Sequence, residues 1–381
     1  MTRNTGSELP HYQNLTVLIM SVEYFESSNF ILFFYIFCAM TEIQQQEYEK
    51  WLTVGGDCQN NIKYQQFLKK LISADCPVIL SIKHLAILLD VELKILRTMI
   101  NHPQSFYYEY SIPKRSGGCR HIASPYPVML RVQRWINKNI LLKISVHEAA
   151  KGFIKGFSIV DNAEPHVGNS VVFKTDIKDF FPSVTINRVR MIFKRLGYRK
   201  KVAFALASLC CLNGVLPQGA ATSPIISNII LKRLDARISG MAKKFGLIYT
   251  RYADDLTLSG TSFPVRIADY IADVIHSEGF IVNEGKSRVL RASAQQIITG
   301  VSISSGSIKL PRKEKREIRK NVHYVLENGL LHHLNHLGIF DPIYLERLLG
   351  KLYFWKSLEP ENKFIEEYLP KVKLALKEGV L

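Results

Sequence analysis

The chain has 381 residues, of which 47% are hydrophobic and 22% are charged. This balance excludes a disordered chain and is sufficient for two or three units with cores of their own. The formal net charge of +17 favours a polyanionic partner, because phosphate neutralisation is the main sequence-independent term in nucleic-acid binding; charge alone is also compatible with a merely basic protein or with attraction to an anionic membrane.

Residues 1–40 contain an apolar run at 30–40. It is shorter than the roughly 20 residues that a bilayer-spanning helix needs. Glu23 and Glu26 precede it, which is untypical of a signal peptide. We favour a reading frame that opens upstream of the true start, with Met20 or Met40 as that start. A packed helix and a membrane-associated segment are the alternatives, and no stable membrane insertion is expected.

Apolar residues at helical spacing predict a helical region over 41–110, with helices near 64–72, 81–90 and 91–99. A hairpin is predicted next at 112–122 (IPKRSGGCRHI), where Ser-Gly-Gly forms the turn. Lys114 and Arg120 on a rigid hairpin suit a triphosphate. A solvated basic turn is the alternative interpretation. An amphipathic helix is expected at 128–142.

An apolar strand at 170–176 (SVVFKTD) ends in Asp176. A carboxylate at a strand end is a candidate Mg²⁺ ligand, because Mg²⁺ takes carboxylates together with substrate phosphates. Taken alone, Asp176 is equally well a polar residue that ends a strand. Helices are predicted at 184–198 and 201–212.

A loop at 216–224 (LPQGAATSP) leads into a helix at 225–234. A glycine in such a loop lets the backbone approach a nucleotide, and a glutamine can bond to its base or sugar. A loop that only caps the helix is the alternative interpretation.

The sequence Tyr252-Ala-Asp-Asp255 lies between β-prone segments, which predicts a hairpin with two carboxylates at its tip. An isolated Asp pair is more often an ordinary turn. With Asp176, however, Asp254 and Asp255 provide the oxygen ligands that two hard cations about 4 Å apart need. A helix at 264–279, a strand and turn at 280–288, a short hairpin at 302–310 and a basic helical C-terminal part are predicted to follow.

In this order, the segments at 112–122, 170–182, 216–224 and 252–255 resemble the fingers and palm of reverse transcriptases. The loop at 216–224 matches the motif Leu-Pro-Gln-Gly-x-x-x-Ser-Pro, and 252–255 matches the Tyr-x-Asp-Asp box. The resemblance implies an α+β right-hand polymerase of fingers, palm and thumb, with an antiparallel palm sheet and an N-terminal helical layer. It divides the chain into an uncertain extension (1–40), a helical region (41–110), fingers and palm (111–300) and a basic, helical thumb (301–381).

The resemblance implies RNA-directed DNA synthesis by two-metal phosphoryl transfer. Asp176, Asp254 and Asp255 are the expected catalytic residues and ligands of two Mg²⁺ ions, with the backbone carbonyl of Ile177 as a further ligand. Phe181 matches the ring that the family places against the sugar, where it excludes a ribose 2′-OH; a core phenylalanine is the alternative. The other expected nucleotide-binding residues are Lys114, Arg120, Gln218, Gly219 and Lys286. Lys286 matches a family lysine near the leaving pyrophosphate, where a cation can act as general acid; a surface lysine is the alternative.

Two short elements resemble the retron branch of this family. Asn162-Ala-Glu-Pro-His166 matches an Asn-Ala-x-x-His element, and Ile298-Thr-Gly300 matches Val-Thr-Gly with Ile in place of Val. A plain loop and a strand turn are the alternatives. The residues expected to contact RNA or the template–primer duplex are Asn162, His166, Thr299, Gly300, Arg312, Arg316 and Arg319. The three arginines lie on one face of the basic helix, and a face exposed only to solvent is the alternative interpretation.

The retron resemblance implies a cognate structured noncoding RNA as partner, dNTPs as substrates and a branched RNA–DNA hybrid (msDNA) primed from a guanosine 2′-OH. It also implies a role in bacterial defence against phage, with a separate effector protein. The six cysteines include no pair or quartet with zinc spacing, which favours free thiols in a bacterial cytoplasm.

Three other functions remain open from the sequence. A group II intron-type reverse transcriptase would typically have longer fingers and an extension beyond the thumb. An RNA-dependent RNA polymerase would more often have Gly-Asp-Asp in place of Ala253-Asp-Asp. A non-catalytic RNA-binding scaffold on the same fold is the alternative of a different class, and the presence of all three acids argues against it.

Overall fold

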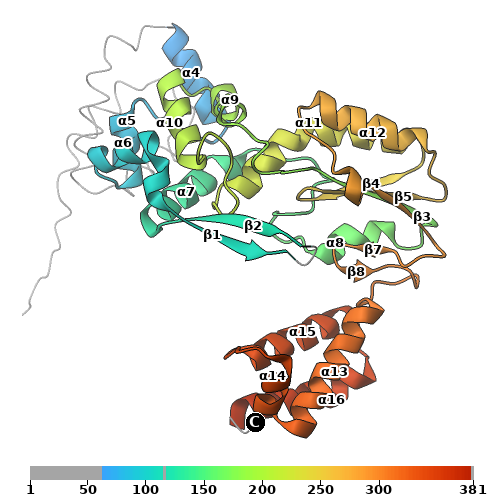
Figure 1. Ribbon diagram of the computed structural model, residues 1–381. Helices are drawn as coiled ribbons and strands as arrows, with labels where there is room; N and C mark the ends of the chain where they lie inside the picture. Colours follow the sequence, from blue (N-terminus) through green and yellow to red (C-terminus); the bar gives the residue numbers. More distant parts are fainter. Residues whose placement is uncertain (1–61, 115–116, 379–381) are drawn as a thin grey trace, which may run out of the picture.

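The computed structural model describes residues 62–114 and 117–378 (Figure 1). The expectations for residues 1–40, and the start of the predicted helical region, lie outside these ranges. In the described part of the chain, no helix is both long enough and apolar enough to cross a bilayer.

The first layer is helical and comprises α4 (Ile62–Ser73), α5 (Ile82–Leu89) and α6 (Leu93–Asn101). The Ser81 hydroxyl accepts a hydrogen bond from the amide of His84 and so caps α5, as a serine at this position is expected to do. The apolar faces of α5 and α6 are buried against α10 (Lys200–Cys210). The predicted N-terminal helical layer is therefore confirmed for the described residues.

The basic hairpin is confirmed as β1 (Tyr107–Pro113) and β2 (Cys119–Pro125), paired in register from Tyr107↔Pro125 to Pro113↔Cys119. A 3₁₀ turn, η2 (Pro103–Phe106), precedes it. The helix α7 (Pro127–Asn139) and a 3₁₀ turn, η3 (Leu141–Lys143), follow it. The hairpin is a two-stranded sheet of its own, beside the main sheet.

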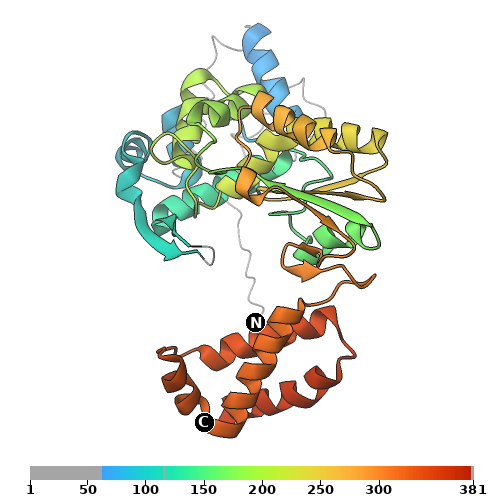
Figure 2. The same cartoon turned by 45° about the vertical axis from the view of Figure 1, so that its right-hand side comes forward.

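The main sheet is antiparallel, with the order β4-β5-β3-β6. Its strands are β3 (Val171–Asp176), β4 (Ile248–Tyr252), β5 (Asp255–Gly260) and β6 (Arg288–Arg291). The helices α11 (Ser223–Lys244) and α12 (Arg266–Ser277) cover one face, and α8 (Ile159–Ala163) with η4 (Glu164–His166) lies on the other (Figures 1 and 2). The helix α9 (Ile186–Leu196) packs beside α10. The predicted α+β class with an antiparallel sheet is confirmed.

Two predicted strand elements differ in the structure: the hairpin predicted at 302–310 is reduced to the single bridge Ser302↔Lys309, and the strand predicted from residue 280 does not form. Residues 280–283 form only the isolated bridge Ile177↔Val282, and the strand begins after the 3₁₀ turn η5 (Glu284–Lys286). The reason is that this segment runs antiparallel to the last residues of β3 for one bridge only, where Asn283 donates its amide to the carbonyl of Asp176 and Lys178 donates to that of Ile281. It is thus held by single hydrogen bonds at the sheet edge and not by a ladder.

The C-terminal part is a helical bundle of α13 (Arg312–Asn328), α14 (Leu330–Leu337), α15 (Tyr344–Leu358) and α16 (Lys363–Glu378), with its own core around Trp355. A short hairpin, β7 (Ile297–Ile298) with β8 (Val301–Ser302), precedes it. Phe354 and Leu358 pack on a small cluster that includes Ala163 and Ile298. The bundle is thereby attached below the sheet in the view of Figure 1.

Candidate active site

Three carboxylates meet where β3 ends and β5 begins. Asp176 lies opposite Asp255 in the strand register, and Asp254 lies in the turn between β4 and β5. Ala253 adopts a left-handed backbone with φ 57°, which makes the turn tight. The amide of Ile177 donates to the carbonyl of Asp254 at 3.2 Å. The structure therefore brings together the three acids that the sequence predicts.

Burial and nearby carboxylate charge raise the pKa of two of these acids, Asp254 and Asp255. Burial, then the charges of Asp255 and Asp176, raise the pKa of Asp254 from 3.8 to about 6. Burial also raises the pKa of Asp255, against the opposing charge of Lys174. Carboxylates in this state are stabilised by an added cation. The cluster is therefore electrostatically suited to a divalent ion.

Asp176 has one carboxylate oxygen to spare. Its Oδ2 accepts from Lys286 Nζ at 2.6 Å, while its Oδ1 is buried and makes no hydrogen bond. No group of three His, Cys, Asp or Glu side chains in the described ranges is arranged to hold a metal ion by itself. Mg²⁺ usually takes only one or two carboxylates and fills its shell with water and phosphate oxygens. The open donor set fits such an ion.

A pH dependence follows from the raised pKa of Asp254. Between pH 3.8 and about 6 the folded protein holds this proton more tightly than the unfolded chain. This contribution to stability is therefore present at low pH and is lost as the pH rises through 6. We expect Mg²⁺ to raise the unfolding temperature more at about pH 8 than at about pH 5, as measured by differential scanning fluorimetry. Asp254→Asn should remove most of the difference; an equal gain at both pH values in the wild type would contradict the assignment.

Phe181 belongs to a group of aromatic rings that extends to Tyr252, the last residue of β4. Its ring centroid is 5.1 Å from that of Phe180 and 6.1 Å from that of Phe153, which in turn is 6.4 Å from Tyr252. Phe180 is buried, whereas Phe181 is half-buried. Phe181 also packs against the main core but keeps part of its surface exposed, so its predicted contact with the sugar stays a prediction. The sequence analysis did not predict that Phe153 joins these rings. Phe153 has a left-handed backbone with φ 63°, which a phenylalanine in a sequence does not indicate.

The loop at 216–224 is tied to the basic hairpin. The carbonyl of Gln218 accepts from the amide of Ala123 at 2.9 Å. Gly219 has φ 127°, and a Cβ at this position would lie 2.6 Å from the carbonyl oxygen of Ala123. The glycine is therefore required by close packing on β2. Lys114 and Arg120 are both exposed on this hairpin.

The two retron-like elements contact each other. Asn162 Nδ2 donates to Thr299 Oγ1 at 3.5 Å. His166 bonds through Nδ1 to Ser259 Oγ at 2.6 Å and through Nε2 to Thr250 Oγ1 at 2.8 Å. Burial lowers the pKa of His166 to about 4, so the ring is neutral. Asn162 and His166 are 0% exposed.

The predicted RNA contact is therefore revised for Asn162 and His166. Neither side chain has surface to offer an RNA in this conformation, because both are enclosed under β4 and β5. Thr299 is half-buried and Gly300 is exposed, so their predicted contacts stay predictions.

On α13, Arg312 and Arg316 are exposed. The guanidinium of Arg319 lies 5.4 Å from the Trp355 ring centroid and 5.3 Å from that of Phe364. Arg319 thus covers the bundle core while it keeps its charge near the surface. The duplex contacts predicted for these three arginines stay predictions.

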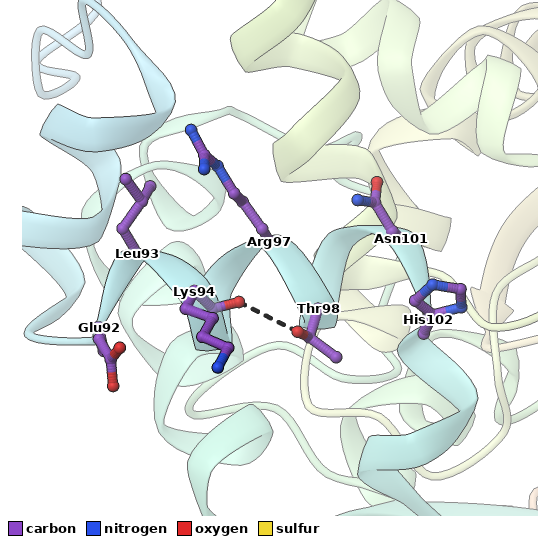
Figure 3. Close-up of a pocket in the computed structure, with 7 residues that line it drawn as sticks. All are labelled: Glu92, Leu93, Lys94, Arg97, Thr98, Asn101 and His102. Carbon is purple, nitrogen blue, oxygen red and sulfur yellow. Dashed lines mark hydrogen bonds between the residues drawn. The ribbon is translucent and has the colours of Figure 1, made fainter.

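A surface depression of about 510 Å³ lies on α6 (Figure 3). Its residues are distant in sequence from the three carboxylates. It is lined by a single helix and the residues at its ends, including Lys94, Arg97 and His102. The Thr98 hydroxyl is already bonded to the carbonyl of Lys94. Convergent acids from several elements are absent from this lining, so we place the site at the carboxylates.

Comparison with known proteins agrees with this placement. Residues 112–324 match the family model "Reverse transcriptase (RNA-dependent DNA polymerase)". The chain belongs to this family and is an RNA-directed DNA polymerase of the reverse transcriptase fold. Reverse transcriptases as a family use divalent metal ions, and the carboxylate cluster fits that use.

Within the family, the chain belongs to the retron branch. The Retron Ec86 reverse transcriptase of Escherichia coli is 36% identical over 260 residues, which cover 67% of this chain and 81% of that protein. The Retron Mx65 reverse transcriptase of Myxococcus xanthus is 39% identical over 311 residues, covering 75% and 70%. The Retron Mx162 reverse transcriptase of the same organism is 37% identical over 252 residues, covering 57% and 52%.

Proposed function

We propose that this enzyme copies part of a cognate structured noncoding RNA into DNA and leaves a branched RNA–DNA hybrid, msDNA. The observation that supports the chemistry best is the register of Asp176 against Asp255, with Asp254 beside them and a free oxygen on Asp176. The similarity to retron enzymes supports the branched product.

The proposed chemistry is two-metal phosphoryl transfer. Two Mg²⁺ ions, when bound, lower the pKa of the primer hydroxyl and neutralise the triphosphate and leaving pyrophosphate. Asp176 and Asp254 would hold the ions, Asp255 would complete the carboxylate cluster, and the carbonyl of Ile177 would add a ligand. Lys286, which pairs with Asp176, gives a proton to the leaving pyrophosphate in this proposal.

The remaining predicted residues bind nucleotide and RNA in this proposal. Lys114 and Arg120 hold the triphosphate, and Gln218 and Gly219 border the nucleotide. The partly accessible Thr299 and Gly300 contact RNA, and the arginines of α13 grip the duplex. Residues 41–110, 111–300 and 301–381 then act as helical layer, fingers and palm, and thumb.

The biological setting is also proposed. The net charge of +17 suits a long RNA partner. The enzyme works in the bacterial cytoplasm, in a retron system that defends against phage together with a separate effector protein.

Nucleic acid that co-purifies with the protein from its native locus tests the proposal. Wild type is compared with the double variant Asp254→Asn, Asp255→Asn, and the nucleic acid is treated with RNase, DNase and debranching enzyme before sequencing. We expect a discrete single-stranded DNA joined to one RNA through a 2′–5′ link, absent from the variant. Linear cDNA would indicate a group II intron-type enzyme, and bound RNA without DNA in both samples would indicate a scaffold.

Phe181→Ala should admit ribonucleotides, because removal of the ring opens space for a 2′-OH. We expect the preference for dNTP over rNTP, measured as a ratio of kcat/KM values, to fall by about tenfold or more. Phe204→Ala, which removes an exposed ring on α10, is the matched control and should keep the wild-type ratio. An unchanged ratio in Phe181→Ala would remove the gate assignment.

A further inference from the structure

A fully buried arginine lies directly behind the catalytic turn. Arg251 is on β4 and is 0% exposed. Its Nε and Nη2 each donate to Asp235 of α11 at 2.7 Å. Its Nη1 donates to Asn228 Oδ1 at 3.0 Å and to the backbone carbonyl of Ala253 at 2.8 Å. One side chain thus joins helix α11 to the turn that bears Asp254 and Asp255.

Stability alone does not account for this group. Transfer of two charges into a protein interior is costly, and well-packed apolar residues of similar volume often stabilise a fold as well or better. Asp235 and Asn228 are themselves 0% exposed, and Asp235 also accepts from the hydroxyl of Tyr249. Burial of these charges therefore has a large desolvation cost, and the property that the ion pair supplies is a fixed geometry.

The ion pair fixes the direction of the Ala253 carbonyl. A guanidinium is planar and rigid, so contacts made by its two ends are fixed relative to each other. The bidentate pair with Asp235 orients the plane, and Nη1 then fixes the Ala253 carbonyl. Because Ala253 is the left-handed residue of the turn, the direction of its carbonyl determines where Asp254 and Asp255 point.

The same unit also holds the neighbouring chain. Asn228 Nδ2 donates to the carbonyl of Gly152 at 2.9 Å. The backbone of Arg251 bonds to Ala149 and to Lys151, both at 2.7 Å. Residues 149–152 therefore lie along β4, and Gly152 packs against the backbone of the turn at Ala253. The turn is held by α11 and by this segment, and Arg251 contacts both.

We infer that Arg251, Asp235 and Asn228 form a positioning unit that fixes the Ala253 carbonyl and so sets the spacing of Asp254 and Asp255 for binding divalent metal. Arg251 is a positioning residue, because it acts through the turn and touches no reacting atom. The inference rests on the proposed two-metal function. The inference requires that changes to this unit weaken metal binding even in variants that remain folded.

The test replaces the ion pair by apolar residues in the double variant Arg251→Met, Asp235→Leu. The matched control is Arg237→Met, Glu278→Leu, which removes an ion pair between α11 and the residue that follows α12, away from the turn. For each protein the unfolding temperature, Mn²⁺ affinity by electron paramagnetic resonance, and DNA synthesis at saturating Mg²⁺ are measured. A purely structural role would move the first quantity and leave the second unchanged in folded protein.

We expect the Arg251→Met, Asp235→Leu protein to unfold at a lower temperature, because Asn228, Tyr249 and the Ala253 carbonyl lose their partners. While still folded, it should bind Mn²⁺ about tenfold more weakly and synthesise DNA about a hundredfold more slowly. The control should keep wild-type affinity and rate. A folded Arg251→Met, Asp235→Leu variant with wild-type Mn²⁺ affinity would overturn the inference.

Arg251→Lys keeps the inference testable if the double variant does not fold. A lysine retains the charge but lacks the fork that spans Asp235 and the Ala253 carbonyl, so weaker Mn²⁺ binding is again expected, and wild-type affinity in the folded protein would overturn the inference. Wild type that neither binds Mn²⁺ nor synthesises DNA would instead remove the proposed function, and this inference with it.

Discussion

Replacing Asp176 with Asn is expected to abolish DNA synthesis and leave the protein folded. Asparagine keeps the shape of the side chain, but it removes the charge of the only acid contributed by β3 to the cluster. Loss of a carboxylate ligand at a metal-dependent phosphoryl-transfer site costs several kcal/mol of transition-state stabilisation, which corresponds to a rate lower by about a thousandfold or more. Primer extension on an RNA template measures the rate, and the unfolding temperature reports the fold.

Asp179→Asn is the matched control for this variant. Asp179 is an exposed acid three residues beyond Asp176, in the turn that follows β3. Its φ of 46° is a conformation that asparagine adopts as readily as aspartate. This control should retain wild-type synthesis. An Asp176→Asn enzyme with substantial activity would remove Asp176 from the metal site.

Replacing Gly152 with Ala is expected to have the second largest effect. A Cβ at this position would lie 2.6 Å from the amide nitrogen of Ala253 and 3.1 Å from the carbonyl carbon of Tyr252. Backbone atoms cannot rotate away as a flexible side chain can, so the catalytic turn must shift. Displacement of a reacting group by about 1 Å can lower a rate by on the order of a hundredfold. Single-turnover primer extension at saturating Mg²⁺ measures the loss.

Gly240→Ala separates this effect from a general response to glycine replacement. Gly240 is exposed on α11, and a Cβ there meets nothing within 4 Å. Alanine should therefore stabilise the helix by about 1 kcal/mol and leave synthesis unchanged. Equal rates for Gly152→Ala and wild type would show that the turn does not depend on close packing against residues 149–152.

Local sequence patterns predicted the catalytic strands well. The β-prone segments around Asp254 and Asp255 form β4 and β5, and the apolar segment before Asp176 forms β3. These predictions succeeded because both the β-prone residues and the turn between them are encoded within a few residues. The prediction for 280–283 failed because this segment pairs with the end of β3 through one bridge only, and a local pattern of apolar residues does not show how long such pairing continues.

The support behind the site was not predicted, because it depends on contacts distant in sequence. Arg251 reaches Asp235 and Asn228, and Asn228 reaches Gly152, 76 residues away. One signal was available: Asp235 interrupts the buried face of α11 between Leu231 and Ile238. An acid on a buried helix face requires a partner. His166 shows the converse case, in which a motif residue expected at the RNA is enclosed in the core.

The most direct test of the metal site is anomalous diffraction from crystals of the enzyme with template–primer, a non-hydrolysable dNTP and Mn²⁺. We expect two anomalous peaks, each contacted by Asp176 or Asp254, with Lys286 turned from Asp176 toward the terminal phosphates. Peaks remote from these carboxylates, with the Lys286–Asp176 ion pair intact beside a bound nucleotide, would contradict the two-metal assignment.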